Sequence, residues 1–240
     1  MNKEENEYFP YVVQIAKALA RYFGQPMLGN KKNPFNELLY IILSSRTPPE
    51  VYQETYRSLR REFRRADSIA ETRPEYVATT IERGGLQNKK ARTITKIASE
   101  LKNRFGRVTL AHLKDMETED AEKFLVSLPG VGIKTARCVL MYSLDRLVFP
   151  VDAHCYRIAQ QLKWIPQDIP LTECLADEIQ SGVPEYLRRD LHVGMVMLGR
   201  NYCLPRSPLH QKCPILEFCP TGRTSVENVS CPKSSNQEPQ

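Results

Sequence analysis

The stretch that decides the fold is AEKFLVSLPGVGIKTARCVLMYSL, residues 121–144. An apolar helix is expected to end at Leu128, because the proline at position 129 cannot continue it. Gly130 and Gly132 follow, and glycine lets a backbone make a tight turn and approach a ligand closely. A second apolar helix is expected directly after the second glycine. The pattern therefore predicts two helices joined by a hairpin turn.

This hairpin is suited to bind a phosphate group through its main chain. The start of the second helix offers unpaired N–H groups and the positive end of the helix dipole. Main-chain contacts from Gly130, Val131 and Gly132 would hold a DNA phosphate without reading the base sequence. An ordinary corner between two helices uses the same glycines, so the hairpin alone leaves both interpretations open.

Two residues that can do chemistry follow the hairpin. Lys134 lies in the first turn of the second helix, and Asp152 comes 18 residues later, in FPVDAHCYRI. Taken singly, Lys134 is also compatible with a solvated lysine. Asp152 is also compatible with the N-cap of a helix over residues 153–164.

Together, LPGVGIKTA and VDAH at this separation resemble the helix-hairpin-helix DNA glycosylases, endonuclease III in particular, from about Phe35 to Cys219. Residues 122–164 also look like the plant 5-methylcytosine glycosylases. The resemblance implies that Lys134 is the Schiff-base lysine and Asp152 the catalytic aspartate. Adenine-mismatch glycosylases of the same superfamily lack a lysine here, so the lysine favours a bifunctional DNA glycosylase and AP lyase.

The chemistry of such an enzyme accounts for these residue types. Cleavage of an N-glycosidic bond builds positive charge on the sugar, which a nearby carboxylate stabilises. An unprotonated amine then attacks C1′ and forms a Schiff base, and burial at a helix N-terminus disfavours the charged ammonium. β-Elimination of the 3′ phosphate nicks the strand.

The resemblance implies base excision repair of damaged or modified pyrimidines in lesion-bearing double-stranded DNA. Oxidised pyrimidines are the default substrate, and methylcytosine or a thymine or uracil mismatch stays open. Two alternatives remain: a helix-hairpin-helix module that binds DNA without catalysis, and a monofunctional mismatch glycosylase whose lysine is inert. The Lys134 and Asp152 pair distinguishes an enzyme from a simple DNA-binding module.

The resemblance also implies an all-α, two-lobed fold with DNA bound between the lobes. Residues 31–148 are expected to form a helical barrel that contains the hairpin. Residues 1–30 are expected to pack with residues 149–220, a second lobe that carries a Cys-rich loop at 203–219. Residues 221–240 are rich in Ser, Asn, Pro and Thr and are expected to be a mobile tail.

The apolar pattern of the chain agrees with an all-α fold. No stretch alternates apolar and polar residues for long enough to predict a strand. Apolar residues recur at helical spacing over residues 11–23, 35–43, 51–63, 94–105 and 121–128.

A base inside a duplex must be flipped out before it is excised, and a side chain must fill the gap. In IERGGLQNKKARTI, Leu86 follows two glycines and is expected to be the wedge, beside Lys89 and Lys90 as phosphate contacts. A core leucine after a helix C-cap glycine is the alternative. The resemblance implies a second filler at Arg46, where endonuclease III usually has glutamine. This departure leaves the choice of substrate open.

Positive charge is concentrated in two segments. The formal net charge is +6, and residues 82–107 hold eight Lys or Arg against two Glu. A second cluster contains Arg57, Arg60, Arg61, Arg64 and Arg65. Localised positive charge indicates a polyanion such as nucleic acid, although a solvated helix face is equally compatible with it.

Four cysteines cluster near the C-terminus, Cys203, Cys213, Cys219 and Cys231, and in a protein expected in the cytosol they favour a metal site over disulfides. The family often carries a structural [4Fe–4S] cluster in the pattern C-x6-C-x2-C-x5-C. This chain has Cys203, His210, Cys213 and Cys219 in that register. Three interpretations stay open: a cluster with His210 as fourth ligand, a cluster or a zinc ion that uses Cys231 instead, and a degenerate site without metal.

The remaining expectations concern location. No apolar run approaches the roughly 18–20 residues that span a membrane, and the acidic, polar start MNKEENEYFP is unlike a secretory signal. We therefore expect a cytoplasmic monomer, associated with the nucleoid if bacterial. Cys138, Cys155 and Cys174 lie among apolar residues and are expected in the core.

Overall fold

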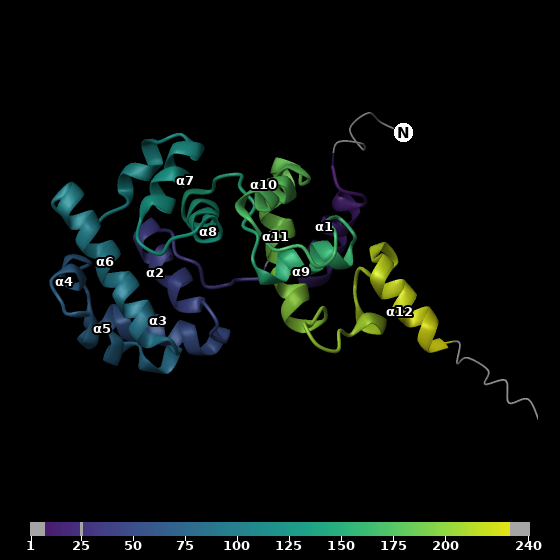
Figure 1. The fold of residues 1–240 in the computed structure, drawn as a ribbon, viewed down its shortest axis with the longest axis horizontal. Coiled ribbons are helices and arrows are strands. Elements are labelled where there is room, and N and C mark those ends of the chain that lie inside the picture. The colour runs from purple at the N-terminus through teal and green to yellow at the C-terminus, as the bar shows by residue number, and fades with distance from the viewer. Residues whose placement is uncertain (1–7, 25, 231–240) are drawn as a thin grey trace, which may run out of the picture. The chain divides into compact units, whose positions relative to one another are not determined.

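The computed structural model describes residues 8–24 and 26–230, and in these ranges every regular element is a helix (Figure 1). The all-α class is thus confirmed. Across these ranges no helix is both long and apolar enough to cross a bilayer. The α-helices are α1 (Val12–Phe23), α2 (Pro34–Ser44), α3 (Pro49–Glu62), α4 (Asp67–Ala70), α5 (Pro74–Thr80), α6 (Gln87–Phe105), α7 (Thr118–Ser127), α8 (Ile133–Leu144), α9 (Ala153–Gln161), α10 (Glu173–Ser181), α11 (Arg188–Asn201) and α12 (Pro220–Ser230).

The chain divides into two compact units. One is the continuous segment Met27–Pro150. The other is discontinuous and combines the described parts of Met1–Pro26 and Val151–Gln240. The hairpin therefore belongs to the first unit, and the cysteine-rich loop belongs to the second.

In the Met27–Pro150 unit, α2 packs against α3 and α8, and α6 packs against α4 and α5. Helix α2 begins sharply, because Asn33 Oδ1 accepts a hydrogen bond from Asn36 N at 3.0 Å and Pro34 occupies the first turn. The helix is apolar on nearly all sides, as expected of a buried helix. The fully buried side chains of the unit include Leu38, Leu39, Leu43, Ile94, Ile97 and Leu101.

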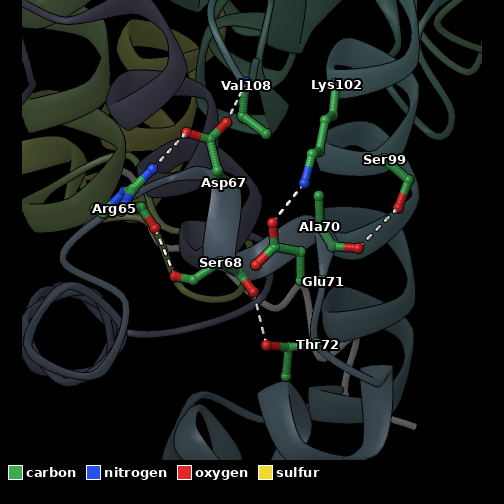
Figure 2. Close-up of polar contacts among 9 residues, drawn as sticks. All are labelled: Arg65, Asp67, Ser68, Ala70, Glu71, Thr72, Ser99, Lys102 and Val108. Atoms are coloured by element: carbon green, nitrogen blue, oxygen red, sulfur yellow. Dashed lines mark hydrogen bonds and ion pairs between the residues drawn. The ribbon is translucent and has the colours of Figure 1, made fainter. Parts of the chain in front are cut away.

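The short helix α4 is joined to α6 and to the segment after it by side-chain contacts, as Figure 2 shows. Asp67 Oδ1 accepts from the Val108 N–H at 2.7 Å, and Oδ2 lies 3.9 Å from Arg65. Lys102 of α6 forms an ion pair with Glu71. Part of the positive charge that suggested a polyanion is thus engaged within the protein.

The discontinuous unit is built on α11, which packs against α1 and α9. The approach of α1 is close, because a Cβ at Gly194 would lie 2.8 Å from Leu19 Cβ. Before α1, the Phe9 ring stacks on Trp164 with centroids 4.9 Å apart, and Trp164 Nε1 donates to the Pro10 carbonyl at 3.1 Å. The start of α1 is thereby fixed to the segment after α9.

Helix α12 occupies residues that composition had predicted to be a mobile tail. Pro220 suits a first helical turn, and Thr221 Oγ1 donates to the Gln161 carbonyl at 2.9 Å. These features hold the start of the helix against α9, so the structure has a helix where the sequence analysis expected none, and the mobility of this segment stays a prediction. The rest of that tail, with Cys231, lies outside the described residues.

The structure also differs from two smaller predictions, which concern the burial of one cysteine and the start of one helix. Cys138 and Cys155 are buried as expected, but Cys174 is exposed on α10, so its assignment to the core is wrong. Helix α6 begins at Gln87 rather than near residue 94. Its first two turns are mostly polar, which hid them from an apolar pattern.

Candidate functional site

The hairpin lies between α7 and α8, where the sequence predicted it. The Val131 N–H donates to the Leu128 carbonyl at 3.1 Å and closes the turn. Gly130 has φ 74°, a left-handed conformation that favours glycine. Gly132 is the N-cap of α8, with open space where a Cβ would be. Val131 is 5% exposed, so its side chain packs into the protein.

An open groove of about 490 Å³ runs beside this turn. A Cβ at Gly130 would lie 3.2 Å from Thr93 Cγ2, so the hairpin and α6 are in direct contact here. The cations of the groove, Lys89, Arg92 and Lys96, are all exposed. Its lining is Asn88, Lys89, Arg92, Thr93, Lys96, Pro129 and Gly130. Three cations beside a glycine turn make a site suited to an anion.

Lys134 is half-buried in the first turn of α8, and its charge influences a buried carboxyl group that the sequence analysis missed. Glu37 of α2 is fully buried. Burial raises the pKa of Glu37 to about 7, while hydrogen bonds from Asn30 and the Lys31 N–H, and the charges of Lys31 and Lys134, lower it. The two helices pack together, and Lys134 therefore lies in the electrostatic range of a buried acid. A single Glu on an otherwise apolar helix was the available signal.

Asp152 is the N-cap of α9 in the discontinuous unit. Its Oδ1 accepts from His154 N at 2.9 Å and from Cys155 N at 2.8 Å. The N-cap interpretation is therefore correct, and it does not exclude catalysis, because the same bonds hold the carboxylate in one orientation. Near the cap, Arg157 donates to the carbonyl of Cys203 at 2.6 and 2.9 Å, which ties α9 to the cysteine-rich loop.

The two residues predicted to fill the gap in DNA lie on exposed loop tips of the Met27–Pro150 unit. Leu86 is 47% exposed, with φ 52°, directly before α6. This exposure rules out the alternative of a core leucine. Arg46 is also exposed, with φ 53°, between α2 and α3.

Lys90 is placed differently from the prediction. Its side chain is 4% exposed and cannot reach a DNA phosphate. The signal was present in the sequence, because Lys90 lies four residues before Ile94 and so shares the apolar face of α6. Lys89, about 100° around the helix, is exposed, as a phosphate contact must be.

The four predicted metal ligands Cys203, His210, Cys213 and Cys219 line one small pocket of about 20 Å³. Burial raises the pKa of all three thiols, that of Cys213 to about 11. The donor types suit zinc or an iron–sulfur cluster, since a bound cation would favour the thiolates. Yet in the described part of the chain no three His, Cys, Asp or Glu side chains are arranged to hold a metal ion.

The fold and the hairpin are those of known DNA repair enzymes. The structure of a non-covalent endonuclease III–DNA complex matches with a TM-score of 0.77 at 23% identity, covering 91% of this chain and 100% of that one. A thermostable thymine-DNA glycosylase matches with a TM-score of 0.74 at 21% identity, covering 89% and 95%. These likenesses show that the chain has the all-α fold of endonuclease III and of this thymine-DNA glycosylase.

The sequence comparisons place it more narrowly. The HhH-GPD superfamily of base excision DNA repair proteins matches residues 39–185, and the chain belongs to this family. Endonuclease III of Thermotoga maritima is 28% identical over 208 residues, covering 87% of this chain and 92% of that protein. A putative DNA glycosylase of Arabidopsis thaliana, At3g47830, is 30% identical over 190 residues, covering 75% and 64%. The resemblance to endonuclease III is thus confirmed.

Proposed function

We propose that this protein is a bifunctional DNA glycosylase and AP lyase that removes damaged or modified pyrimidines from double-stranded DNA. The observation that carries the proposal is the position of Lys134, half-buried in the first turn of α8 directly behind the phosphate-binding hairpin. A protein that only grips phosphate does not need an amine at this point. Asp152, held by two N–H groups, supplies the carboxylate.

In the proposed reaction, the carboxylate of Asp152 stabilises positive charge on the sugar as the glycosidic bond breaks and the base leaves with its electron pair. The unprotonated Lys134 Nζ forms a bond to C1′. The amine gives one proton to the departing base and one to O4′ as the sugar ring opens, and water is consumed only later, when hydrolysis of the imine frees the enzyme. The resulting imine makes the C2′ proton acidic, and loss of this proton expels the 3′ phosphate.

The proposed partner is lesion-bearing DNA, bound through its backbone. The hairpin main chain and the cations Lys89, Arg92 and Lys96 of the neighbouring groove would contact phosphates. Leu86 and Arg46 would fill the space that the extruded base leaves, since both are exposed at loop tips.

We also propose that the pocket in the second unit binds a [4Fe–4S] cluster through Cys203, His210, Cys213 and Cys219, with zinc as the alternative metal. The cluster would be structural and would hold the cysteine-rich loop in place. The catalytic steps above do not involve it.

Borohydride trapping on a duplex with one abasic site tests the role of Lys134, because this substrate requires no knowledge of the excised base. Wild-type protein should form a covalent adduct and nick the strand. Lys134→Ala should do neither while still binding the duplex. Lys114→Ala, which removes an exposed lysine of the same unit, should behave as wild type.

The outcomes separate the candidate functions. Trapping of Lys134→Ala at the wild-type rate would show that another amine is the nucleophile. Base release without trapping by the wild type would identify a monofunctional glycosylase with an inert lysine. Binding without base release across a panel of lesion-bearing duplexes would identify a DNA-binding module, and the same panel identifies the excised base.

A further inference from the structure

The ammonium group of Lys90 lies where two loops of the Met27–Pro150 unit meet. Its Nζ donates to the Leu43 carbonyl at 2.8 Å, to Thr47 Oγ1 at 2.7 Å and to the Gly84 carbonyl at 2.8 Å. A lysine ammonium has three protons to donate. All three are therefore used inside the protein, and the first two acceptors are far from the third in sequence.

The first acceptor belongs to the end of α2. The last four carbonyl groups of a helix have no partner within it. In α2, three of these carbonyls accept from Ser44 Oγ and from main-chain N–H groups of the following loop. The fourth is that of Leu43, and it accepts from Lys90. A cation at this end is also favoured by the helix dipole, so Lys90 caps a helix from which the Arg46 loop departs.

The third acceptor belongs to the turn that leads to the Leu86 tip. Gly84 is packed tightly there, because a Cβ would lie 3.1 Å from Thr55 Cγ2 of α3. Thr47 Oγ1 donates to the Gly84 carbonyl at 2.6 Å, so the two loops are also joined directly. Lys90 Nζ, Thr47 Oγ1 and the Gly84 oxygen thus form a closed set of contacts beneath both tips.

Both tips have a backbone that must be held by its surroundings. Arg46 has φ 53° and directly precedes Thr47; Leu86 has φ 52° and follows Gly84 by two residues. Left-handed conformations are uncommon for residues with a Cβ and persist where neighbouring contacts fix them. Two acceptors of the Lys90 ammonium, Thr47 and Gly84, lie one and two residues from these tips.

We propose that Lys90 is a positioning residue that couples the Arg46 loop to the Leu86 loop, so that both tips enter the DNA as one preformed unit. The inference rests on the proposed function, in which these tips fill the gap left by the extruded base. Two separately mobile tips would each lose conformational freedom on insertion, whereas a coupled pair is already ordered. Lys90 itself does not touch DNA.

The chemistry of the side chain fits this role better than a role in packing. Burial lowers the pKa of Lys90 to about 8, which shows that the charged form is disfavoured where it lies. Its partners are uncharged oxygens, so no ion pair offsets this cost. An apolar side chain would fill the same space more favourably, but it would leave the carbonyls of Leu43 and Gly84 unbonded and the two loops separate.

The test follows insertion into a duplex that contains a tetrahydrofuran abasic-site analogue with 2-aminopurine opposite it. We expect Lys90→Met to slow the fluorescence change at saturating protein about tenfold, the scale of losing one buried hydrogen-bonding partner. Its dissociation constant and salt dependence should stay close to wild type. Lys114→Met, the matched control, removes an exposed lysine of the same unit outside the groove, and it should leave affinity, salt dependence and insertion rate close to wild type.

A double-mutant cycle separates positioning from a general loss of stability. With Lys90 present, Arg46→Ala and Leu86→Ala should be coupled, so that the double variant loses less than the product of the single losses. In the Lys90→Met background the losses should multiply to within about twofold, as for independent sites. A merely structural role would slow insertion without removing this coupling.

Two results would overturn the inference: insertion by Lys90→Met at the wild-type rate, or undiminished coupling in its background. If Lys90→Met does not fold, Thr47→Val removes one acceptor of the same set and decides the question by the same two measurements. Failure of the proposed function is distinguishable, because wild-type protein would then not nick a duplex with an abasic site, whereas the Lys90 measurements compare insertion alone.

Discussion

At the scale of single residues, Asp152 combines a structural and a proposed catalytic role. Asp152→Asn keeps an oxygen that can accept the two N–H bonds at the start of α9, but it removes the negative charge. We expect base excision under single-turnover conditions to fall at least about 10²-fold, as when one electrostatic partner of a transition state is removed. Affinity for DNA should be equal or higher, because a carboxylate repels phosphates.

The matched control for this charge change is Asp168→Asn, an exposed position of the same unit whose left-handed backbone asparagine tolerates. It should excise at the wild-type rate. Near-normal excision by Asp152→Asn would show that the carboxylate serves only as a cap.

Glu37 gives a prediction for pH. Its pKa is about 7 in the folded protein against an ordinary 4.5, so the folded state binds the extra proton between these values. Stability from this group therefore falls as the pH rises from 4.5 through 7. Glu37→Gln removes the dependence, and from pH 4.5 to above 7 its unfolding free energy should gain up to about 3 kcal/mol relative to wild type.

Denaturant unfolding at pH 5 and pH 8 measures this difference. Glu50→Gln, at an exposed position of α3, is the control and should not alter the change in unfolding free energy between these two pH values. Glu37→Gln also tests the environment of Lys134. If the buried acid influences the amine, the pH profile of borohydride trapping should differ between Glu37→Gln and wild type. If the unfolding free energies of wild type and Glu37→Gln changed in parallel with pH, the raised pKa of Glu37 would be contradicted.

At the scale of elements, α6 has one face that packs into the core and another that is exposed and basic. Its exposed cations Lys89, Arg92 and Lys96 line the groove beside the hairpin. If each neutralises one phosphate, every removal should make the slope of log K against log salt shallower by about 0.9. Arg92→Met and Lys96→Met should show this individually, and the double variant should show the sum.

Lys102 serves as the control on the same helix, because it pairs with Glu71 (Figure 2). Lys102→Met should leave the salt slope unchanged. A slope that changes equally for Lys96→Met and Lys102→Met would indicate a general charge effect rather than a phosphate-binding groove.

The cysteine-rich loop gives a prediction about metal content. Anaerobically purified protein should contain iron, His210→Ala should lose it, and His210→Cys should retain it, since four thiolates are the usual ligand set. Cys231→Ser should keep its iron. Loss of iron in Cys231→Ser but not in His210→Ala would assign the fourth ligand position to Cys231, and metal-free wild type that still nicks DNA would remove the cluster from the proposal.

At the scale of the whole molecule, local signals in the sequence predicted the turn and helix ends that proline, glycine and N-cap residues define. Pro129, Gly130 and Gly132 marked the hairpin, and the structure has its turn there. Asp152 was recognised as an N-cap. These features depend on backbone preferences of a few neighbouring residues, which a sequence displays directly.

The features that the sequence analysis missed depend on tertiary contacts. Lys90 was counted with Lys89 because both are basic, although one faces inward and meets acceptors from two distant loops. Glu37 was passed over because its importance comes from the packing of α2 against α8. The helix at Pro220–Ser230 has a composition typical of a tail and is held by its contact with α9.

The discontinuous unit has a consequence for how the protein is made. Helix α1 leaves the ribosome before α11, against which it packs and which is translated about 165 residues later. At 5–20 residues per second this interval is on the order of ten seconds or more. During that time the Met27–Pro150 segment can collapse on its own, whereas the apolar stripe of α1 has no lasting partner. The nascent chain therefore passes through a stage in which its N-terminal helix is the segment most exposed to chaperones and to misassociation with other chains.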